Sequence, residues 1–450
     1  MVFGRDVYRR NIGRSGMPGL EPILLIDPEA YVIGPCWRLD RKRQLYNNMF
    51  GNKYFRPFAR RSLISTTESI KHFLESHTSE MSIDTRLRAT SYMRVKETQA
   101  TFEIEGENDR VSEARKWCTL LRRVKDLPLN NEKGTLSVAK SLFPAESIDY
   151  NEWRSSEIFI GRTKTKPTGQ FEENIYHIGA KAQDLQTLMA GFFSVMNNCL
   201  QFSNGDFSDR HPLLRKNHQA FDHISIIALL SLSFTIIHPL CEGNGRIHRL
   251  LIHYLLECFK IVDSWLVPVS IIILHDNLKT GNKDRILRAI SEPIMRQTKY
   301  RFVDRELKIT NDTRLLYECW EGTAAVEYMH SLLGKSIRIS IDCALYIQIW
   351  DQCLKDLDEA REKLTHSQLK MLIGRYLQSG KVSGHTLKQL QKKNIKESTT
   401  LAVSRICERV LSDDPCAFKE PFEPFNLHDL QYTEDTDFVP VGLDLPSQPA

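Results

Sequence analysis

The chain has 450 residues, of which 41% are hydrophobic and 26% charged, a balance typical of a soluble globular protein with two or three domains. Its ten cysteines include no C-x-x-C pair, which argues against a zinc ribbon or a disulfide framework and fits a cytoplasmic location. The first twenty residues lack the apolar segment of a secretory signal, and the longest apolar run, residues 224–237, is too short to span a membrane.

The formal net charge of +5 is unevenly distributed. Residues 413–450 contain nine acidic residues and one lysine, a net charge of −8, so residues 1–412 carry +13. The acidic, proline-rich tail is expected to be extended or disordered, whereas the basic remainder suits anionic partners. With the motifs described below, the sequence predicts units at residues 1–83, 84–124, 125–298, 299–412 and 413–450.

The N-terminal part of the chain is mainly helical in pattern. Residues 1–83 are mixed, with helical patterns near 40–50 and 62–75, and they suggest no chemistry. Residues 84–105 contain no glycine or proline and carry a partial apolar stripe, which predicts a helix; the stripe consists of Leu87, Met93, Val95, Phe102 and Ile104. A second helix is expected at 109–123, with Asn108 as its cap.

The middle of the chain is mainly helical in pattern. Before these helices, residues 150–178 place apolar segments on either side of a polar stretch at 162–174. An apolar, β-branched segment is also present at 267–274. Helices are expected at residues 182–198, 221–238, 250–259 and 284–290.

A loop between two of these helices carries the clearest chemistry, reading His238-Pro-Leu-Cys-Glu-Gly-Asn-Gly-Arg-Ile-His-Arg249. Gly243 and Gly245 flank Asn244 where the second helix begins. Unpaired N–H groups and the positive end of the helix dipole favour phosphate oxygens at such a place, and glycines allow close approach. The loop is therefore expected to bind an anion.

Four charged or titratable side chains surround this loop. Arg246 and Arg249 are three residues apart and share one helix face, which suits two successive phosphates. Glu242 is placed to hold a divalent cation, for which Mg²⁺ is the natural candidate. His238, at the end of the preceding helix, could accept a proton from an attacking hydroxyl.

The loop resembles the signature of the Fic family, His-Pro-Phe-x-Asp/Glu-Gly-Asn-Gly/Lys-Arg, in its longer form that ends in a second arginine. Every constrained position matches except Leu240, where the family usually has phenylalanine. The resemblance implies a mainly α fold: a Fic-type helical bundle with a small β-hairpin flap at 150–178 and a helical C-terminal extension. The polar segment 162–174 would be the tip of this flap, which in relatives aligns a segment of the target protein as an added strand. An ordinary surface hairpin is the alternative interpretation.

A second motif, Thr101-Phe-Glu-Ile-Glu105-Gly106, resembles the inhibitory helix of the same family. The resemblance implies that Glu105 reaches Arg249 and occupies the position of the γ-phosphate of ATP. An ordinary helix end, with Gly106 as its left-handed residue, is the alternative interpretation of these six residues.

The resemblance implies protein AMPylation. AMP would pass from ATP, with Mg²⁺ as cofactor, to a Ser, Thr or Tyr hydroxyl of a target protein. His238 would be the base, Glu242 the metal ligand, and Glu105 the inhibitor. Nucleotide binding is expected at Gly243, Asn244, Gly245, Arg246 and Arg249. Self-modification and assembly into a homo-oligomer are further possibilities.

Other activities stay open at this stage. Relatives that transfer the γ-phosphate have lysine at the position of Gly245, which disfavours a kinase. Removal of AMP by the same site is an alternative, because some relatives use the inhibitory glutamate to orient water. A nucleotide- or DNA-binding regulator is another, since residues 364–390 could form a helix-turn-helix with Lys388, Gln389 and Lys392 on its second helix.

Overall fold

The computed structural model describes residues 31–35, 55–60, 67–79, 81–107, 111–143, 150–165, 171–203, 223–262, 267–280, 285–304, 306–318, 320, 322–359, 364–379 and 395–412. Its fold is mainly helical, as the sequence predicts. The described strands form small antiparallel pairs: β1 (Tyr31–Pro35) with β2 (Phe55–Arg60), β3 (Phe159–Thr165) with β4 (Phe171–Ile178), and β5 (Tyr300–Val303) with β6 (Glu306–Ile309). None of the described helices is both long and apolar enough to cross a membrane.

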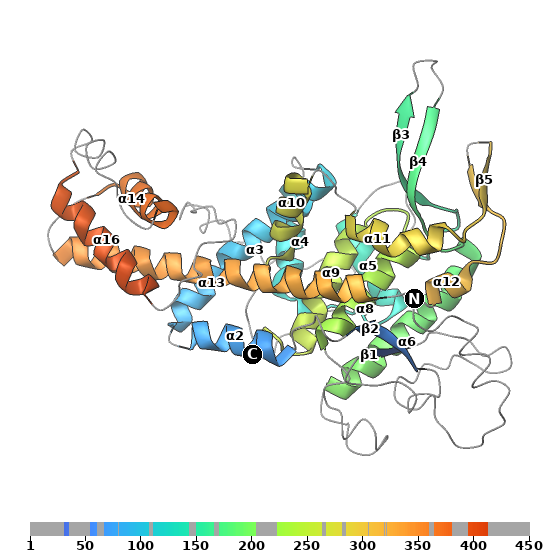
Figure 1. Ribbon diagram of the computed structural model, residues 1–450, viewed down its shortest axis with the longest axis horizontal. Coiled ribbons are helices and arrows are strands. Elements are labelled where there is room, and N and C mark those ends of the chain that lie inside the picture. The colour runs from blue at the N-terminus through green and yellow to red at the C-terminus, as the bar shows by residue number, and fades with distance from the viewer. Residues whose placement is uncertain are drawn as a thin grey trace.

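The centre of the molecule is α8 (His223–Ile237), which is apolar on all sides and buried along nearly its whole length. Such a helix is stable only when other elements cover every face. It packs against α9 (Asn244–Cys258), α6 (Leu185–Ser203) and the long helix α13 (Thr323–Glu359), as Figure 1 shows. The loop motif therefore joins two helices of the core, α8 before it and α9 after it.

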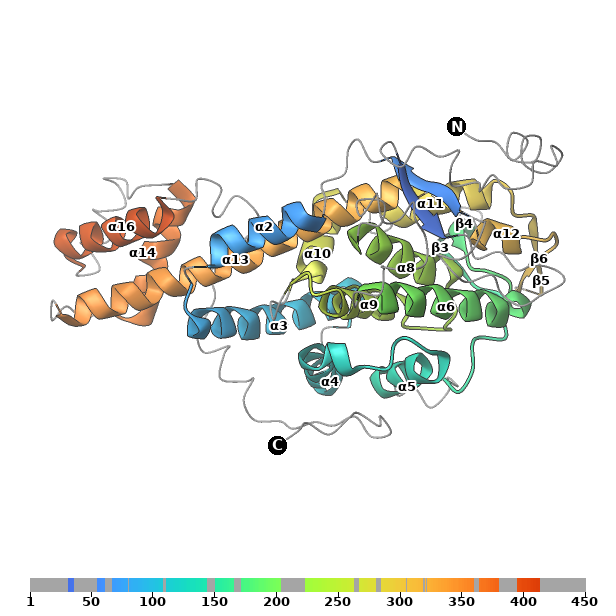
Figure 2. The same cartoon turned by 90° about the horizontal axis from the view of Figure 1, so that it is seen from below.

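The helices lie in layers, seen from below in Figure 2. One layer contains α3 (Ile83–Glu105), α9 and α6, and a further layer below it contains α4 (Val111–Arg122) and α5 (Glu132–Leu142). On the opposite side α13 runs the length of the molecule and packs along α3 and α8. The other described helices are α2 (Thr67–Thr78), α10 (Val269–Thr280), α11 (Arg285–Met295), α12 (Arg314–Glu318), α14 (His366–Ser379) and α16 (Glu397–Leu411), with short 3₁₀ turns η2 (Val124–Asp126) and η3 (Ala182–Asp184).

The bounds of α3 follow from its caps. Ser82 precedes the helix and its hydroxyl accepts a hydrogen bond from the Thr85 N–H at 3.0 Å. At the other end Gly106 adopts φ 76°, and the N–H groups of Gly106 and Glu107 donate to the carbonyls of Glu103 and Phe102, both at 3.0 Å. This is the Schellman arrangement, for which glycine is the favoured residue.

The apolar stripe expected on this helix is wrong in part. Leu87 is 59% exposed, whereas small and polar positions such as Ala89, Glu97 and Thr101 are fully buried. The reason is that α3 is covered from several sides by α4, α10 and α13, so no single face decides which residues are buried.

One other expectation needs correction, and several lie outside the described residues, namely the helical pattern near 40–50, the cap at Asn108 and the acidic tail at 413–450. The apolar segment 267–274, for which the sequence predicted no element, lies in helix α10 from Val269 onward. The expected hairpin tip at 162–174 is strand at both of its ends, because the ladder continues from Arg162↔Asn174 to Thr165↔Phe171. Backbone hydrogen bonds form such a ladder without an apolar pattern. The basic helix proposed to read DNA, with Lys388, Gln389 and Lys392, falls in residues 380–394, which the structure does not describe.

Candidate active site

The loop between α8 and α9 turns sharply at His238, whose φ of 56° is in the left-handed region. Such a backbone is uncommon for a residue with a side chain and costs free energy that the surroundings must offset. Pro239 then prevents the helix from continuing. A second left-handed residue, Gly243 with φ 85°, precedes the first residue of α9.

Gly243 is also required by space. A Cβ atom there would lie 2.3 Å from the ring of Phe143, so a larger residue cannot be accommodated without moving that side chain. Gly245 has a related role on the other side of Asn244, because a Cβ there would meet the Glu105 carboxylate at 2.9 Å. The two glycines expected at the phosphate-binding loop thus also leave room for Phe143 and Glu105.

His238 is held in one tautomer. Its Nδ1–H donates to the carbonyl of Thr235 at 3.0 Å, and in a neutral imidazole this leaves Nε2 as the proton acceptor. Burial lowers its pKa from 6.5 to about 4. The ring is therefore neutral at physiological pH, which is the state a general base requires.

Arg154 holds the main chain of the loop through hydrogen bonds. Its guanidinium donates to the carbonyl oxygens of His238 at 2.7 Å, Ser156 at 2.6 Å and Ala180 at 2.5 Å, and its own N–H donates to Pro239 O at 3.1 Å. Burial lowers its pKa to about 10, so it stays charged at neutral pH. In the sequence this residue is only one position of the segment 150–178, and its partner His238 lies 84 positions away, so no local pattern indicates the contact.

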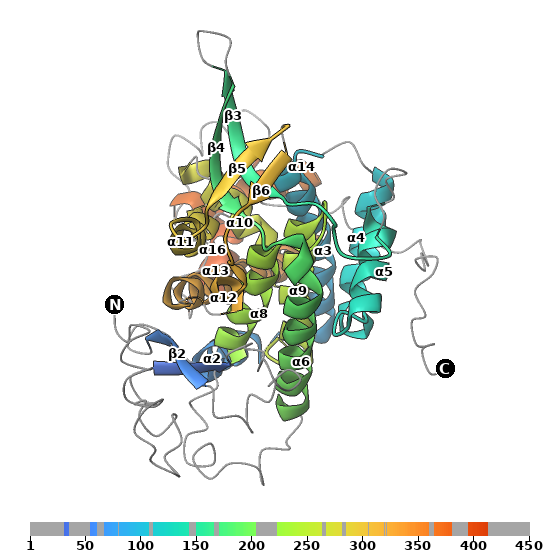
Figure 3. The same cartoon turned by 90° about the vertical axis from the view of Figure 1, so that its right-hand side faces the viewer.

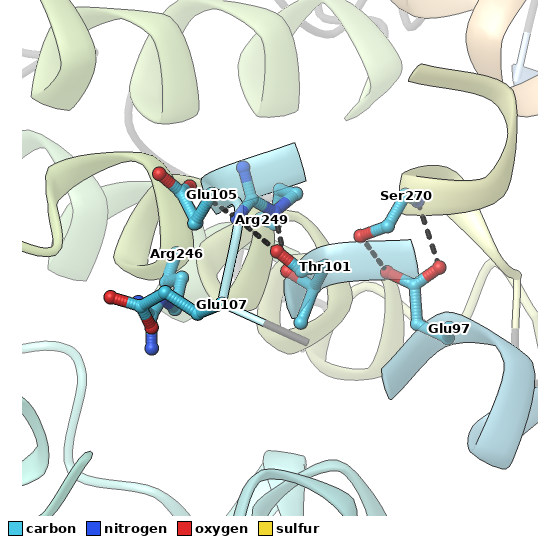
Figure 4. A network of polar contacts seen from close by, with 7 residues as sticks. All are labelled: Glu97, Thr101, Glu105, Glu107, Arg246, Arg249 and Ser270. Carbon is cyan, nitrogen blue, oxygen red and sulfur yellow. Dashed lines mark hydrogen bonds and ion pairs between the residues drawn. The ribbon is translucent and has the colours of Figure 1, made fainter. Parts of the chain in front are cut away.

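The two arginines of α9 each meet a carboxylate from the end of α3 (Figure 4). Arg249 Nη2 lies 2.7 Å from Glu105 Oε1, and Arg249 Nε donates to the Thr101 hydroxyl at 2.7 Å. The contact that the family resemblance implied between Glu105 and Arg249 is therefore present. Arg246 Nη2 pairs with Glu107 Oε2, a partner that the sequence analysis did not assign.

Arg246 is nearly enclosed. Its guanidinium carbon lies 4.9 Å from the centre of the Phe102 ring and 4.7 Å from that of Phe143, and the residue is 5% exposed. Aromatic faces attract a cation, and the surrounding apolar groups strengthen any charge pairing by excluding water. Phe143 thus contacts both Arg246 and Gly243, although nothing in the sequence singled it out.

Glu242 and its neighbour Cys241 are exposed at the mouth of the loop. A carboxylate there fits the oxygen-ligand preference of Mg²⁺. Across the described residues no three His, Cys, Asp or Glu side chains gather as a metal site, so a cation at Glu242 would take its other ligands from phosphates and water. The residues present fit a metal that arrives with a nucleotide.

A buried carboxylate fixes α3 relative to the site. Glu97 is fully buried and accepts hydrogen bonds from the N–H of Ser270 at 2.8 Å and from the Ser270 hydroxyl at 2.5 Å (Figure 4). Glu97 Oε1 also lies 3.0 Å from His253 Nε2. Ser270 is in the first turn of α10, where helix N–H groups lack partners. Glu97 therefore joins α3 to α9 and α10.

The hairpin β3–β4 rises beside the site (Figure 3). Its base is tied to α8, because the fully buried His177 lies 2.8 Å from the carbonyl of Ile236 through Nε2. Gly179 follows the hairpin and leaves room for His238. A Cβ atom added to Gly179 would lie 3.1 Å from the Cβ of His238. His248, by contrast, points to the Ser231 carbonyl of α8 at 2.8 Å and away from the phosphate loop.

The family model for the Fic/DOC family matches residues 148–256, which contain the hairpin, α6, α8, the loop and most of α9. This part of the chain is a Fic domain. Proteins of the Fic family generally transfer AMP or another nucleotide onto proteins. The segment with Glu105 and Glu107 precedes the matched residues.

Two solved structures of Fic proteins show distant similarity to the chain. A Fic domain containing signaling protein from Bacteroides thetaiotaomicron VPI-5482 is 15% identical, with a TM-score of 0.37 over 62% of this chain and 97% of the other. A Fic family protein from Desulfovibrio desulfuricans G20 is 16% identical, with a TM-score of 0.36 over 78% of this chain and 93% of the other. A search of curated proteins finds no match.

Proposed function

We propose that the chain is a protein adenylyltransferase that moves AMP from ATP to a Ser, Thr or Tyr hydroxyl of a target protein. The observation that carries the proposal is the arrangement of His238 and the first turn of α9. A neutral imidazole with its Nε2 lone pair stands beside a helix N-terminus that bears two buried arginines. That combination suits attack of a hydroxyl on a phosphate.

In the reaction, His238 Nε2 takes the proton as the hydroxyl oxygen forms its bond to the α-phosphorus. The bond from the α-phosphorus to the bridging oxygen breaks, and pyrophosphate leaves with that oxygen. Arg246 and Arg249 neutralise the β- and γ-phosphates, and the loop N–H groups face the α-phosphate. Glu242 would hold Mg²⁺, which supplies positive charge to the phosphates.

Asn244 has a structural role in this mechanism in addition to the nucleotide contact expected of it. Its side-chain amide pairs with the main chain of Leu240 and so shapes the loop, and the second N–H of the amide can face the α-phosphate together with the loop N–H groups. Proper loop geometry is what aligns the phosphates with His238, and misalignment of a bound substrate by about 1 Å can cost on the order of 100-fold in rate.

The second part of the proposal is inhibition by Glu105. Its carboxylate accepts from Arg249 at 2.7 Å, in the place where the terminal phosphate of ATP would bind. The carboxylate also lies close to Gly245, because a Cβ atom added to this glycine would be only 2.9 Å from Glu105 Oε1. A triphosphate can therefore adopt a reactive position only after Glu105 leaves.

The test compares wild type with Glu105→Gly, each incubated with Mg²⁺, a cell extract that supplies acceptor proteins, and ATP labelled at either the α- or the γ-phosphate. The account predicts protein-bound label from the α position only, and more of it with Glu105→Gly. Label from the γ position would instead indicate phosphoryl transfer. No label from either would count against transfer.

Removal of AMP is the second candidate, because the charge of Glu105 acts on His238, whose pKa it raises against the larger lowering by burial. A carboxylate in that position could orient water toward a bound AMP-protein. A target labelled by Glu105→Gly, freed of ATP and mixed with wild type, would lose its label if the wild type removes AMP. Retained label would exclude removal of AMP from that target.

A further inference from the structure

We propose that Glu107 is a second, independent obstacle to nucleotide binding. Its carboxylate pairs with the guanidinium group of Arg246, as the carboxylate of Glu105 pairs with that of Arg249. This inference rests on the proposed function of the α9 arginines as phosphate ligands. Each arginine would then have its own internal carboxylate. The six-residue motif that predicted Glu105 ends at Gly106 and does not include Glu107.

The turn at Gly106 is what places both carboxylates correctly. Glu105 is the last residue of α3, and the left-handed Gly106 with its two closing hydrogen bonds reverses the chain before Glu107. Glu105 and Glu107 therefore approach arginines that lie three residues apart on one face of α9 (Figure 4). Each of the two acids therefore pairs with a different guanidinium group.

The burial of Arg246 makes its pairing with Glu107 consequential. The arginine side chain is 6% exposed and that of Glu107 is 24% exposed. A buried cation that loses its partner is strongly destabilising, whereas an incoming phosphate would restore the pairing. A β-phosphate and the Glu107 carboxylate must therefore compete for the same guanidinium group.

Phosphate number separates the two obstacles. AMP reaches neither arginine, ADP places a phosphate at Arg246, and ATP places phosphates at both. Neutralising Glu107 should therefore strengthen binding of ADP and ATP, and neutralising Glu105 should strengthen binding of ATP alone. This dependence on the ligand distinguishes displacement at Arg246 from a general change in charge.

A matched control is available on the same turn of α3. Glu103 is exposed, and among the residues that the structure describes it makes no ion pair or side-chain hydrogen bond. Glu103→Gln removes the same charge near the site as Glu107→Gln but leaves both arginines paired. Any effect that both variants share measures long-range electrostatics alone.

The experiment is calorimetric titration of the full chain with AMP, ADP and ATP in the presence of Mg²⁺. Wild type, Glu103→Gln, Glu105→Gln, Glu107→Gln and the double variant Glu105→Gln/Glu107→Gln are compared, with thermal unfolding to check that each is folded. Glu107→Gln is expected to bind ADP at least about tenfold more tightly than Glu103→Gln, equivalent to about 1.4 kcal/mol. AMP binding should be the same in all variants.

An affinity for ADP that is equal in Glu107→Gln and Glu103→Gln overturns the inference. If Glu105→Gln then still tightens ATP and labels protein, the proposed function stands without it. Conversely, tighter ADP binding by Glu107→Gln with no transfer of α-label by any variant supports competition at Arg246 and rejects the proposed reaction. The two failures are therefore distinguishable.

Discussion

The side chain of Asn244 is paired in both directions with the main chain of Leu240. Asn244 Nδ2–H donates to the Leu240 carbonyl at 2.7 Å, and Asn244 Oδ1 accepts from the Leu240 N–H at 3.0 Å. Both residues are buried. This pair closes the loop on itself just before α9 begins, and it gives the glycine-flanked asparagine of the signature a structural reason.

Replacing Asn244 by alanine should therefore reduce stability as well as activity. The change removes the side-chain partner of a buried N–H and a buried C=O of Leu240, which we expect to cost about 2–6 kcal/mol at roughly 1–3 kcal/mol per buried group. Urea unfolding of Asn244→Ala would measure the loss. Unchanged unfolding with lost transfer would instead indicate that the amide acts only on the nucleotide.

Arg154 should matter more for the loop than its distance in sequence suggests. Arg154→Met removes the donor from three carbonyl oxygens, including that of His238, and we expect a loss of roughly 3–5 kcal/mol in unfolding free energy. Arg154→Lys should recover part of it, because lysine keeps the charge but cannot reproduce the planar fork. Equal stability of the methionine and lysine variants would contradict this role.

The depressed pKa of His238 predicts an acid-tolerant reaction. Because burial places this pKa near 4, the base stays deprotonated as pH falls through 6.5, the ordinary value. In Glu105→Gln, kcat/KM, which reports the free enzyme, should stay nearly level between about pH 7 and pH 5.5. An inflection near 6.5 would show that the ring is solvated.

Burial of neutral histidines also makes the folded protein less stable at acidic pH, so unfolding is measured at each pH alongside the rate. His177, His238 and His248 have pKa values lowered to about 3, 4 and 4, all because of burial. Their contribution to stability is complete above about pH 6.5 and is lost as pH falls toward these values, because the unfolded chain then binds more protons. Rates are therefore compared only at pH values where the protein is folded.

Gly106 should control how well Glu107 reaches Arg246. An added Cβ meets nothing within 4 Å, so only the backbone conformation, φ 76°, resists substitution. A β-branched residue is strongly disfavoured there and asparagine is tolerated. Gly106→Val is expected to strengthen ADP binding by displacing Glu107, with a smaller effect for Gly106→Asn. Equal ADP affinity in both variants and wild type would count against the role of this turn.

The sequence predicts the parts of the site whose residues are adjacent in the chain, and it misses contacts between segments that are far apart in the chain. The loop from His238 to Arg249 could be interpreted because adjacent residues on a helix start have a known geometry. Glu105 was assigned only through a family resemblance, since its partner is 144 positions away. Glu107 and Phe143 depend on the packing of α3 and α5 beside α9, and no spacing rule relates those segments.

Elements were predicted in the same way. The apolar run at 224–237 predicted α8, because a helix buried on all sides is apolar throughout. The run at 250–259 predicted only the later part of α9, whose first turns carry buried arginines and a histidine. The segment 267–274 was ambiguous, since a short apolar run does not distinguish strand from helix. Its helix begins where Glu97 of a different helix accepts the N–H of Ser270, a tertiary contact invisible to local patterns.

The most direct test of the account measures AMP on protein in the Glu105→Gly background with and without His238. Glu105→Gly and Glu105→Gly/His238→Ala are incubated with ATP, Mg²⁺ and the same extract, and acceptor peptides are examined by mass spectrometry. The account predicts hydroxyl side chains that gain the mass of one AMP with the first variant and none with the second. Equal modification by both would show that His238 is not the base and would contradict the central claim.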